Sequence, residues 1–261
     1  MQASLTLDPA PDAQYLLRTG DTCLVLAQRL AEWCGHAPVL EEDIALANMA
    51  LDLLGQARAL LTRAGRSGGP GQPAHDEDQL AFLRDERDFR NLTIAELPRG
   101  DFAVTVLRNA MVATLLRQLW HRLRDSSDAE VAAIAAKAVK EARYHQRHAA
   151  DWVLRLADGT DESRRRMEAA LRRLWPYRHE MFEAGDPVDE AAAASGLGPR
   201  WSELREPWHA DMGALLAEAG LEPPADTPFR STGRHGRHSE HLGPLLAEMQ
   251  SLQRAHPGGV W

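Results

Sequence analysis

The sequence has few cysteines, few aromatic residues and no excess of positive charge, and each shortage excludes a class of protein. Two cysteines among 261 residues cannot build the disulfide framework of a small secreted domain, so a cytoplasmic location is expected. A net charge of −8 argues against nucleic acid as the main partner, because phosphate binding needs clustered positive charge. The N-terminus lacks a basic segment followed by an apolar run, so no secretory signal peptide is predicted.

Long apolar runs are missing as well. No stretch approaches the roughly 20 apolar residues of a membrane-spanning helix, so no membrane partner is expected. One basic stretch consists of Arg164, Arg165, Arg166, Arg172 and Arg173. A solvated helix face is the favoured interpretation of this stretch, and a docking surface for an acidic partner is the alternative.

Strand patterns are also absent from the sequence, and the periodicity that is present is helical. Apolar residues recur at helical spacing in four long segments, 13–34, 41–64, 101–124 and 129–156. A long connection separates the second segment from the third. Two helices, a long crossover and two further helices are the topology of a ferritin-like four-helix bundle.

Loops and accessory helices complete the predicted layout. Further helices are predicted over 161–184, 199–219 and 240–255. Residues 1–12 are predicted to form a loose tail, and the glycine- and proline-rich segment 65–76 a flexible loop. We therefore predict a single all-α, ferritin-like domain over residues 1–261, with a long crossover and extra C-terminal helices.

The second predicted helix is apolar on two sides. One stripe contains Ile44, Ala47, Leu51 and Leu54. The other stripe contains Leu46, Met49, Leu53, Ala57 and Leu60. A helix of this kind is expected to lie at the centre of its domain.

The same helix has the frame of a metal site without the ligands. A di-iron carboxylate bundle takes one Glu from each of two helices and Glu-x-x-His from each of the other two, and the i, i+3 spacing places both ligands on one helix face. Within segment 52–58 the Glu position is Leu53 and the His position is Gln56, and neither side chain suits iron. The third helix has no Asp or Glu between Asp101 and Asp125. The pattern indicates a catalytic fold that has lost its metal ligands.

The fourth helix retains part of such a site. Glu141 is followed at i+3 by Tyr144, and His145 is preceded at i−3 by Ala142, so neither register gives Glu-x-x-His. Glu32 of the first helix is a candidate carboxylate, although a surface or cap position fits it equally well. The vestigial ligand positions are therefore Glu32, Leu53, Gln56, Glu141, Tyr144 and His145. We predict no catalytic residue, no bound metal and no cofactor site in this chain.

Three interpretations are open for the polar residues of the fourth helix. Glu141, His145 and His148 share a stripe with apolar residues, so they need partners if they are buried. An internal hydrogen-bonded cluster is the favoured interpretation. A residual mononuclear metal site and a partner-facing role are the alternatives.

Two further groups contain reactive side chains. The run from His235 to His241 contains three histidines mixed with arginine, and a solvated loop before a helix is favoured there over a metal site. Cys34 falls on the apolar stripe of the first helix, so a packed cysteine is favoured over a reactive thiol.

Several phrases, in order along the chain, resemble the C-type structural subunits of bacterial phenylacetyl-CoA epoxidases. These phrases are 23–30, 32–38, 51–58, 84–91, 100–103, 140–145 and 240–250. The resemblance extends from about Tyr15 to Trp261, and its length makes it more specific than a single motif.

The resemblance implies a ferritin-like subunit without working metal ligands in a multicomponent monooxygenase of aerobic phenylacetate breakdown. In this family a di-iron A subunit binds the CoA thioester and epoxidises its aromatic ring with O₂. A small B subunit bridges the assembly, and a reductase subunit with flavin and an iron–sulfur centre supplies electrons from NADPH. The C-type subunit pairs with the A subunit, and we expect the exposed apolar surface for that pairing on the second and third helices.

Two other functions compete with this one. The chain could itself be a di-iron oxygenase with atypical ligands, which requires iron at Glu141 and His145. It could also be a free-standing helical adaptor, which predicts a stable monomer with no affinity for a di-iron subunit.

Overall fold

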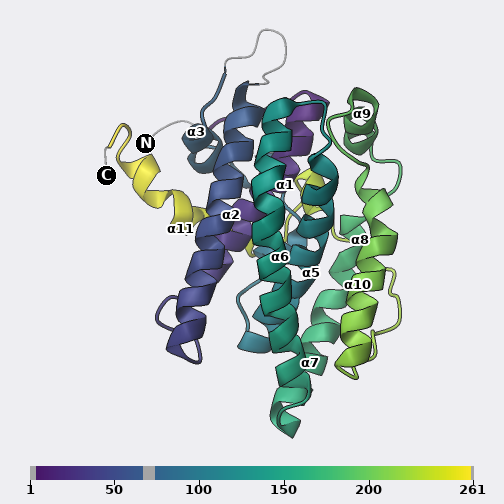
Figure 1. Ribbon diagram of the computed structural model, residues 1–261. Helices are drawn as coiled ribbons and strands as arrows, with labels where there is room; N and C mark the ends of the chain where they lie inside the picture. Colours follow the sequence, from purple (N-terminus) through teal and green to yellow (C-terminus); the bar gives the residue numbers. More distant parts are fainter. Residues whose placement is uncertain (1–3, 67–73, 260–261) are drawn as a thin grey trace.

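A computed structural model describes residues 4–66 and 74–259 of the chain (Figure 1). Most of the loop predicted over 65–76 therefore lies outside the described residues. Its described ends are Gly65 and Arg66, which close the second helix, and residues 74–76, which precede the next one.

Four long helices form the bundle. They are α1 (Pro11–Ala31), α2 (Leu40–Arg66), α5 (Phe102–Leu123) and α6 (Ala129–Ala157). Three of the four starts have a local cause. Proline at the first position of α1 has no N–H that would need a partner, and the side chains of Asp101 and Asp128 accept hydrogen bonds from free N–H groups of α5 and α6. The helices α1 and α2 pack closely as one pair and α5 and α6 as the other, so the bundle has the expected pairing.

The crossover and the C-terminal part add short helices around the bundle. The crossover contains α3 (Glu77–Phe82), η1 (Glu86–Asp88) and α4 (Thr93–Glu96). The C-terminal part contains α7 (Asp161–Leu174), η2 (Trp175–Tyr177), α8 (Arg178–Met181), α9 (Pro187–Ser195), η3 (Trp201–Leu204), α10 (Arg205–Glu218), η4 (Gly233–His235) and α11 (Leu242–Ala255). No strand occurs in the described residues, which confirms the predicted all-α, ferritin-like bundle with a long crossover and extra C-terminal helices.

Several predicted boundaries were wrong. The predicted helix over 161–184 ends at Leu174, because Pro176 cannot donate a backbone hydrogen bond and the chain continues as the 3-10 turn η2. Helix α9 was not predicted at all. The first helix starts at Pro11, inside the predicted tail. Earlier in that tail, the backbone N–H of Leu5 donates to the carbonyl of Leu83 at 2.8 Å, so Leu5 is not loose.

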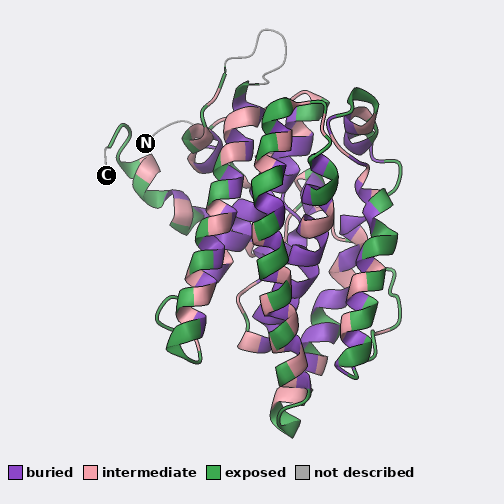
Figure 2. Cartoon of the chain, in the orientation of Figure 1, coloured by how far each residue is buried: buried purple, intermediate pink, exposed green. Residues whose placement is uncertain are grey.

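Helix α5, and not α2, is the central helix (Figure 2). It is buried along most of its length, because α7 and α10 cover the side that faces away from α6. Only the inner stripe of α2 is buried, and the outer stripe is exposed at Leu40, Ile44 and Leu51. The expectation of a central second helix is therefore wrong, and so is the expectation of exposed apolar surface on the third.

The length and composition of α2 would also allow it to cross a membrane, which differs from the expectation that no stretch comes close. Its inner face nevertheless packs in the bundle, where 11 of its 27 residues are buried. The first turn of the helix contains Glu41, Glu42 and Asp43.

Candidate functional site

The inward-facing residues of the four bundle helices meet around a cavity of about 10 Å³, which has room for roughly one water molecule. Leu26, Leu30, Met49, Leu53, Asn109, Ala113, Leu116 and His145 line it. Among the described residues no carboxylate lines this cavity, and His145 is the one strong metal donor there. Two irons need several carboxylates and two imidazoles, so the side chains at the bundle centre do not fit a di-iron group.

The two Glu-x-x-His positions of α2 face the centre of the bundle. Leu53 and Gln56 are both buried, as the Glu-x-x-His spacing requires. The Gln56 amide binds two neighbours: its Oε1 accepts from the Cys23 thiol at 3.6 Å, and its Nε2 donates to Glu141 Oε2 at 2.9 Å. Gln56 therefore holds α1, α2 and α6 together through hydrogen bonds where a histidine would bind metal.

On α6 the inward register is the one that contains His145. Ala142 and His145 are buried, whereas Tyr144 is 46% exposed on the outer side. The carboxylate position of the inward frame is therefore Ala142. Glu141 lies between these faces and turns toward α2, where it meets Gln56.

Glu32 is remote from this cluster. It follows the last residue of α1, and its carboxylate pairs with Arg29 one turn earlier. It does not line the central cavity. The structure thus brings Leu53, Gln56 and His145 together with Glu141, and leaves Glu32 and Tyr144 outside.

Three cross-helix contacts form what we call the α2–α6 polar ladder: Gln56–Glu141, Asp52–His145 and Glu42–His148. His145 Nε2 lies 3.0 Å from Asp52 Oδ2. His148 Nε2 lies 2.9 Å from Glu42 Oε2, but the angles are poor for a hydrogen bond, so this is a close polar contact only. Burial lowers the pKa of His145, although the hydrogen bond and charge of Asp52 oppose this shift. The ladder agrees with the favoured interpretation of an internal hydrogen-bonded cluster.

Sequence reasoning missed the contribution of Asp52 and Glu42 to the ladder. Asp52 stands directly beside Leu53 in the sequence, but its pairing with His145 depends on how α2 and α6 are rotated about their axes. No spacing within one helix determines that rotation.

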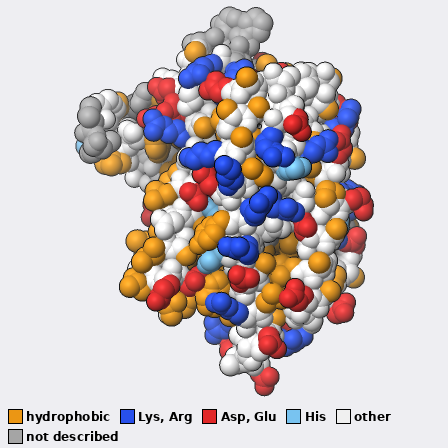
Figure 3. Space-filling model, viewed as in Figure 1, with side chains coloured by type: hydrophobic (Ala, Val, Ile, Leu, Met, Phe, Trp, Pro, Cys, Tyr) orange, Lys and Arg blue, Asp and Glu red, His pale blue; other side chains and the backbone are white. Residues whose placement is uncertain are grey.

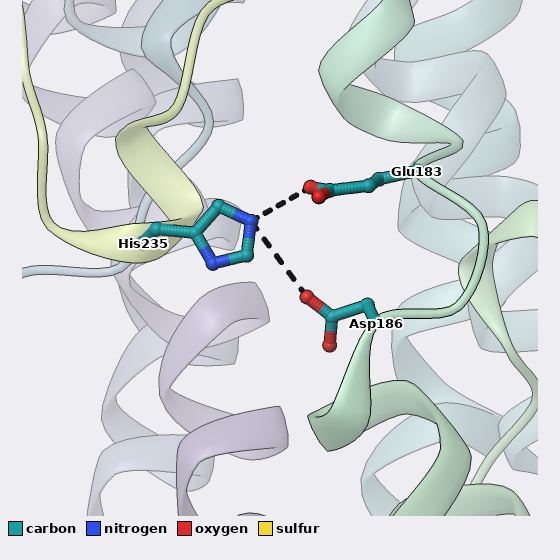
Figure 4. Close-up of side chains that lie close together, drawn as sticks. All are labelled: Glu183, Asp186 and His235. Atoms are coloured by element: carbon teal, nitrogen blue, oxygen red, sulfur yellow. Dashed lines mark hydrogen bonds and ion pairs between the residues drawn. The ribbon is translucent and has the colours of Figure 1, made fainter.

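A second group of metal-type ligands lies between α8 and η4, outside the bundle centre (Figure 4). His235 Nε2 lies 2.7 Å from Glu183 Oε2 and 3.8 Å from Asp186 Oδ2. Both oxygens of Asp186 already accept hydrogen bonds from Arg18, at 2.7 and 2.9 Å. Burial alone would raise the pKa of Asp186, but the hydrogen bonds and charge of Arg18 outweigh it and lower the pKa to about 2.

That carboxylate belongs to a buried ion-pair network. Arg18 of α1 also donates to Asp189 at 3.0 Å, and Arg234 donates to the same carboxylate at 2.8 Å. Two guanidinium groups lie beside Asp186 and would repel a cation placed there. They also occupy lone pairs of the Asp186 carboxylate that a metal ion would need. We therefore interpret Glu183, Asp186 and His235 as part of a structural network that joins α1 to the C-terminal segment.

The remaining histidines of the run from His235 to His241 do not join this group. The side chain of His238 is buried and pairs with Glu96, so the interpretation as a solvated loop is wrong at this position. Cys34 is exposed, because α1 ends three residues before it, and the prediction of a packed cysteine is wrong as well.

The His238–Glu96 pair predicts a pH dependence of stability. Burial would lower the pKa of His238, but the 2.7 Å contact with Glu96 outweighs it, and the pKa is raised. A raised folded-state pKa stabilises the protein fully below the unfolded value of about 6.5, and this contribution is lost as pH rises through the folded value. The excess stability of the wild type over a His238→Asn variant should therefore be larger at pH 6 than at pH 9.

Urea unfolding of both proteins at the two pH values measures that difference. His121→Asn, at an exposed position, is the control and should show no such trend. Equal differences at both pH values would contradict the prediction.

The fold and the bundle centre together define a class: a ferritin-like bundle that keeps the inward frame of the carboxylate proteins but lacks the carboxylates of a di-iron site. The chain belongs to the family described as phenylacetic acid catabolic protein, which matches residues 4–261. It is 50% identical over 247 residues to the C subunit of the 1,2-phenylacetyl-CoA epoxidase of Escherichia coli (strain K12). The match covers 95% of this chain and 98% of that protein, which confirms the family resemblance of the sequence phrases.

Proposed function

We propose that this chain is the structural subunit of a phenylacetyl-CoA epoxidase, and that it pairs with the di-iron subunit that carries out the reaction. In this role it stabilises a catalytic bundle that inserts one oxygen atom of O₂ into the aromatic ring of phenylacetyl-CoA. The identity with the epoxidase subunit along nearly the whole chain supports this function.

One observation carries the non-catalytic part of the proposal. The four positions of the two inward Glu-x-x-His frames are Leu53 and Gln56 on α2, and Ala142 and His145 on α6. Helix α5 adds only Asn109, Ala113 and Leu116 to the centre. A single imidazole and an amide cannot balance the charge of two irons.

The other components of the reaction belong to other subunits in this proposal. The di-iron centre resides in the A subunit, and flavin and the iron–sulfur centre in the reductase that draws electrons from NADPH. A small B subunit completes the assembly. We further propose that the chain acts in the cytoplasm as one ferritin-like domain over 1–261, with neither nucleic acid nor membrane as a partner.

Metal analysis of the purified chain, alone and co-expressed with the di-iron subunit, tests the proposal. We expect essentially no iron in the lone chain and about two irons per heterodimer in the pair, because a di-iron site needs the ligand set that this chain lacks. A Glu141→Gln variant can still bond to Gln56 and is the matched control: it should leave the iron content of the pair unchanged.

About two irons in the lone chain would instead favour the di-iron oxygenase with atypical ligands. Glu32, Glu141 and His145 would then be the first residues to replace. A stable monomer that binds no di-iron subunit would favour the free-standing adaptor.

A further inference from the structure

The outer stripe of α2 is an apolar surface without a covering element. Leu40, Ile44, Ala47 and Leu51 follow each other at helical spacing, and three of them are more than half exposed: Leu40 72%, Ile44 54% and Leu51 63%. Val39, at 49%, extends the stripe at its start. Isolated exposed apolar residues are common, but a continuous stripe on one helix marks a contact surface.

A basic row runs along the neighbouring helix α6. It consists of Lys137, Lys140, Arg143 and Arg147, all exposed. Lys137 pairs with Glu141 at 3.5 Å, whereas Lys140, Arg143 and Arg147 have no ion-pair partner within residues 4–66 and 74–259. Arginines elsewhere on the surface differ in this respect: Arg122 pairs with Glu203 and Arg200 with Glu190, whereas scattered positions such as Arg173 have no ion pair among the described residues.

The two lysines of this row are the only lysines in the chain; every other cation among the 30 Lys and Arg residues is an arginine. On a protein with a net charge of −8, an unpaired basic row has no internal function to explain it. An unpaired charged row is suited to an external carboxylate-bearing surface.

The outer stripe and the basic row form one continuous face. The α2–α6 polar ladder joins the helices in antiparallel order, with Gln56–Glu141 toward one end and Glu42–His148 toward the other. The basic row therefore lies toward the first end and the most exposed apolar residues toward the second. Figure 3 shows hydrophobic side chains gathered over the lower part of α2, with Lys and Arg side chains beside them along α6.

The middle of this α2–α6 face carries two large exposed side chains. Leu51 and Tyr144 are each adjacent in sequence to a member of the Asp52–His145 pair, and they are 63% and 46% exposed. The apolar end also carries exposed Glu41 and Asp151, so the face is basic at one end and acidic at the other. Such a face is complemented by a helical surface of opposite polarity laid antiparallel across it, with apolar side chains meeting Leu51 and Tyr144.

We infer that the α2–α6 face is the docking surface for the related ferritin-like subunit of the same oxygenase, and that this partner presents a row of carboxylates to the basic row of α6. This inference rests on the proposed function and adds to it the place and chemistry of the pairing. A related bundle fits because two long adjacent helices are needed to cover both α2 and α6. A membrane surface fits less well, because the exposed carboxylates of Glu41 and Asp151 would face the lipid headgroups.

The two lysines allow a direct footprint of the face. Reductive methylation of the wild-type chain, alone and in the complex co-expressed with the other oxygenase subunits, is followed by mass spectrometry of the peptides that contain Lys137 and Lys140. We expect both lysines to react at least fivefold more slowly in the complex. Equal rates in the complex and the lone chain would overturn the inference, because 81% of the Lys137 side chain is accessible in the single chain.

Charge reversal tests the same face through affinity. The variant Lys140→Glu, Arg143→Glu, Arg147→Glu should bind the partner at least tenfold more weakly, and the wild-type complex should weaken between 50 and 500 mM NaCl, conditions that differ severalfold in screening length. The matched control reverses three other exposed arginines, as Arg124→Glu, Arg172→Glu, Arg173→Glu, and should bind as the wild type does. Thermal melting of each lone chain verifies that all variants fold.

The outcomes separate this inference from the function on which it rests. If the wild type pairs with the di-iron subunit and the α6 reversal pairs equally well, the face is wrong while the function stands. If the wild type pairs with no subunit, the proposed function fails. The inference is also overturned if the reversal abolishes only self-association in light scattering, or only binding to phosphatidylglycerol vesicles.

Discussion

Replacing Asp21 by alanine should lower the free energy of unfolding by about 3–5 kcal/mol, because it leaves a buried guanidinium without its counter-ion. Asp21 of α1 and Arg84 of the crossover are both fully buried and form a two-pronged ion pair. The same carboxylate accepts the backbone N–H of Arg90 at 2.8 Å. One side chain thus fixes the crossover against the first bundle helix.

Equilibrium urea unfolding measures this loss. The control is Glu203→Ala, which removes the partner of Arg122 from an exposed pair and should cost no more than about 1 kcal/mol. The double variant Asp21→Ala, Arg84→Met should recover part of the loss, because no unpaired charge is then left inside. A cost for Asp21→Ala as small as that of Glu203→Ala would show that Arg84 finds water or another partner.

Placing a carboxylate at the first Glu-x-x-His position of α2, as Leu53→Glu, should destabilise the protein by about 4 kcal/mol at pH 7. Leu53 is 2% exposed beside a cavity that no Arg or Lys among the described residues lines, and burial lowers the pKa of His145, the one imidazole there. A buried glutamate can have a pKa of about 8–9, against about 4.3 in the unfolded chain. Folding at pH 7 must then protonate the introduced glutamate, which costs free energy. The decrease in the free energy of unfolding should therefore shrink by about 1.4 kcal/mol for each pH unit below 7.

Unfolding at pH 7, 6 and 5 tests both the size and the slope of this loss. Leu53→Met keeps the position apolar at similar volume and should cost less than about 1.5 kcal/mol at every pH. A Leu53→Glu protein as stable as the wild type at pH 7 would mean that the bundle centre still accepts a charged ligand. Metal titration of that variant would then be the next measurement.

The sequence predicted the bundle helices well because each has a long apolar period, and three of them also have a local start signal. It also predicted that Leu53 and Gln56 share the inner face of α2, and both are buried. On α6 two registers were open, and packing against the neighbouring helices selects the one with Ala142 and His145. That choice depends on the rotation of α6, which a single helical period leaves undetermined.

The wrong predictions of exposure share a different cause: a segment far away in sequence packs over the residue or helix that was expected to be exposed. Helix α5 is central because α7 and α10 cover its second side, and no pattern within 102–123 predicts those neighbours. His238 is buried because Glu96, 142 residues earlier, meets it. Short elements such as α9 also have too few residues for a clear period.

The network around Arg18 has a consequence for the order in which the chain is made. Its partners Asp186 and Asp189 follow 168 and 171 residues later. At typical ribosomal speeds of about 5–20 residues per second, these partners emerge roughly 10–30 s after Arg18. During that time the guanidinium of Arg18 must stay hydrated, although α1 can already pack against α2 and pair with Arg84 through Asp21. The contacts of the first helix synthesised are therefore among the last to be completed, and nascent chains that stall before about residue 190 should depend on chaperones.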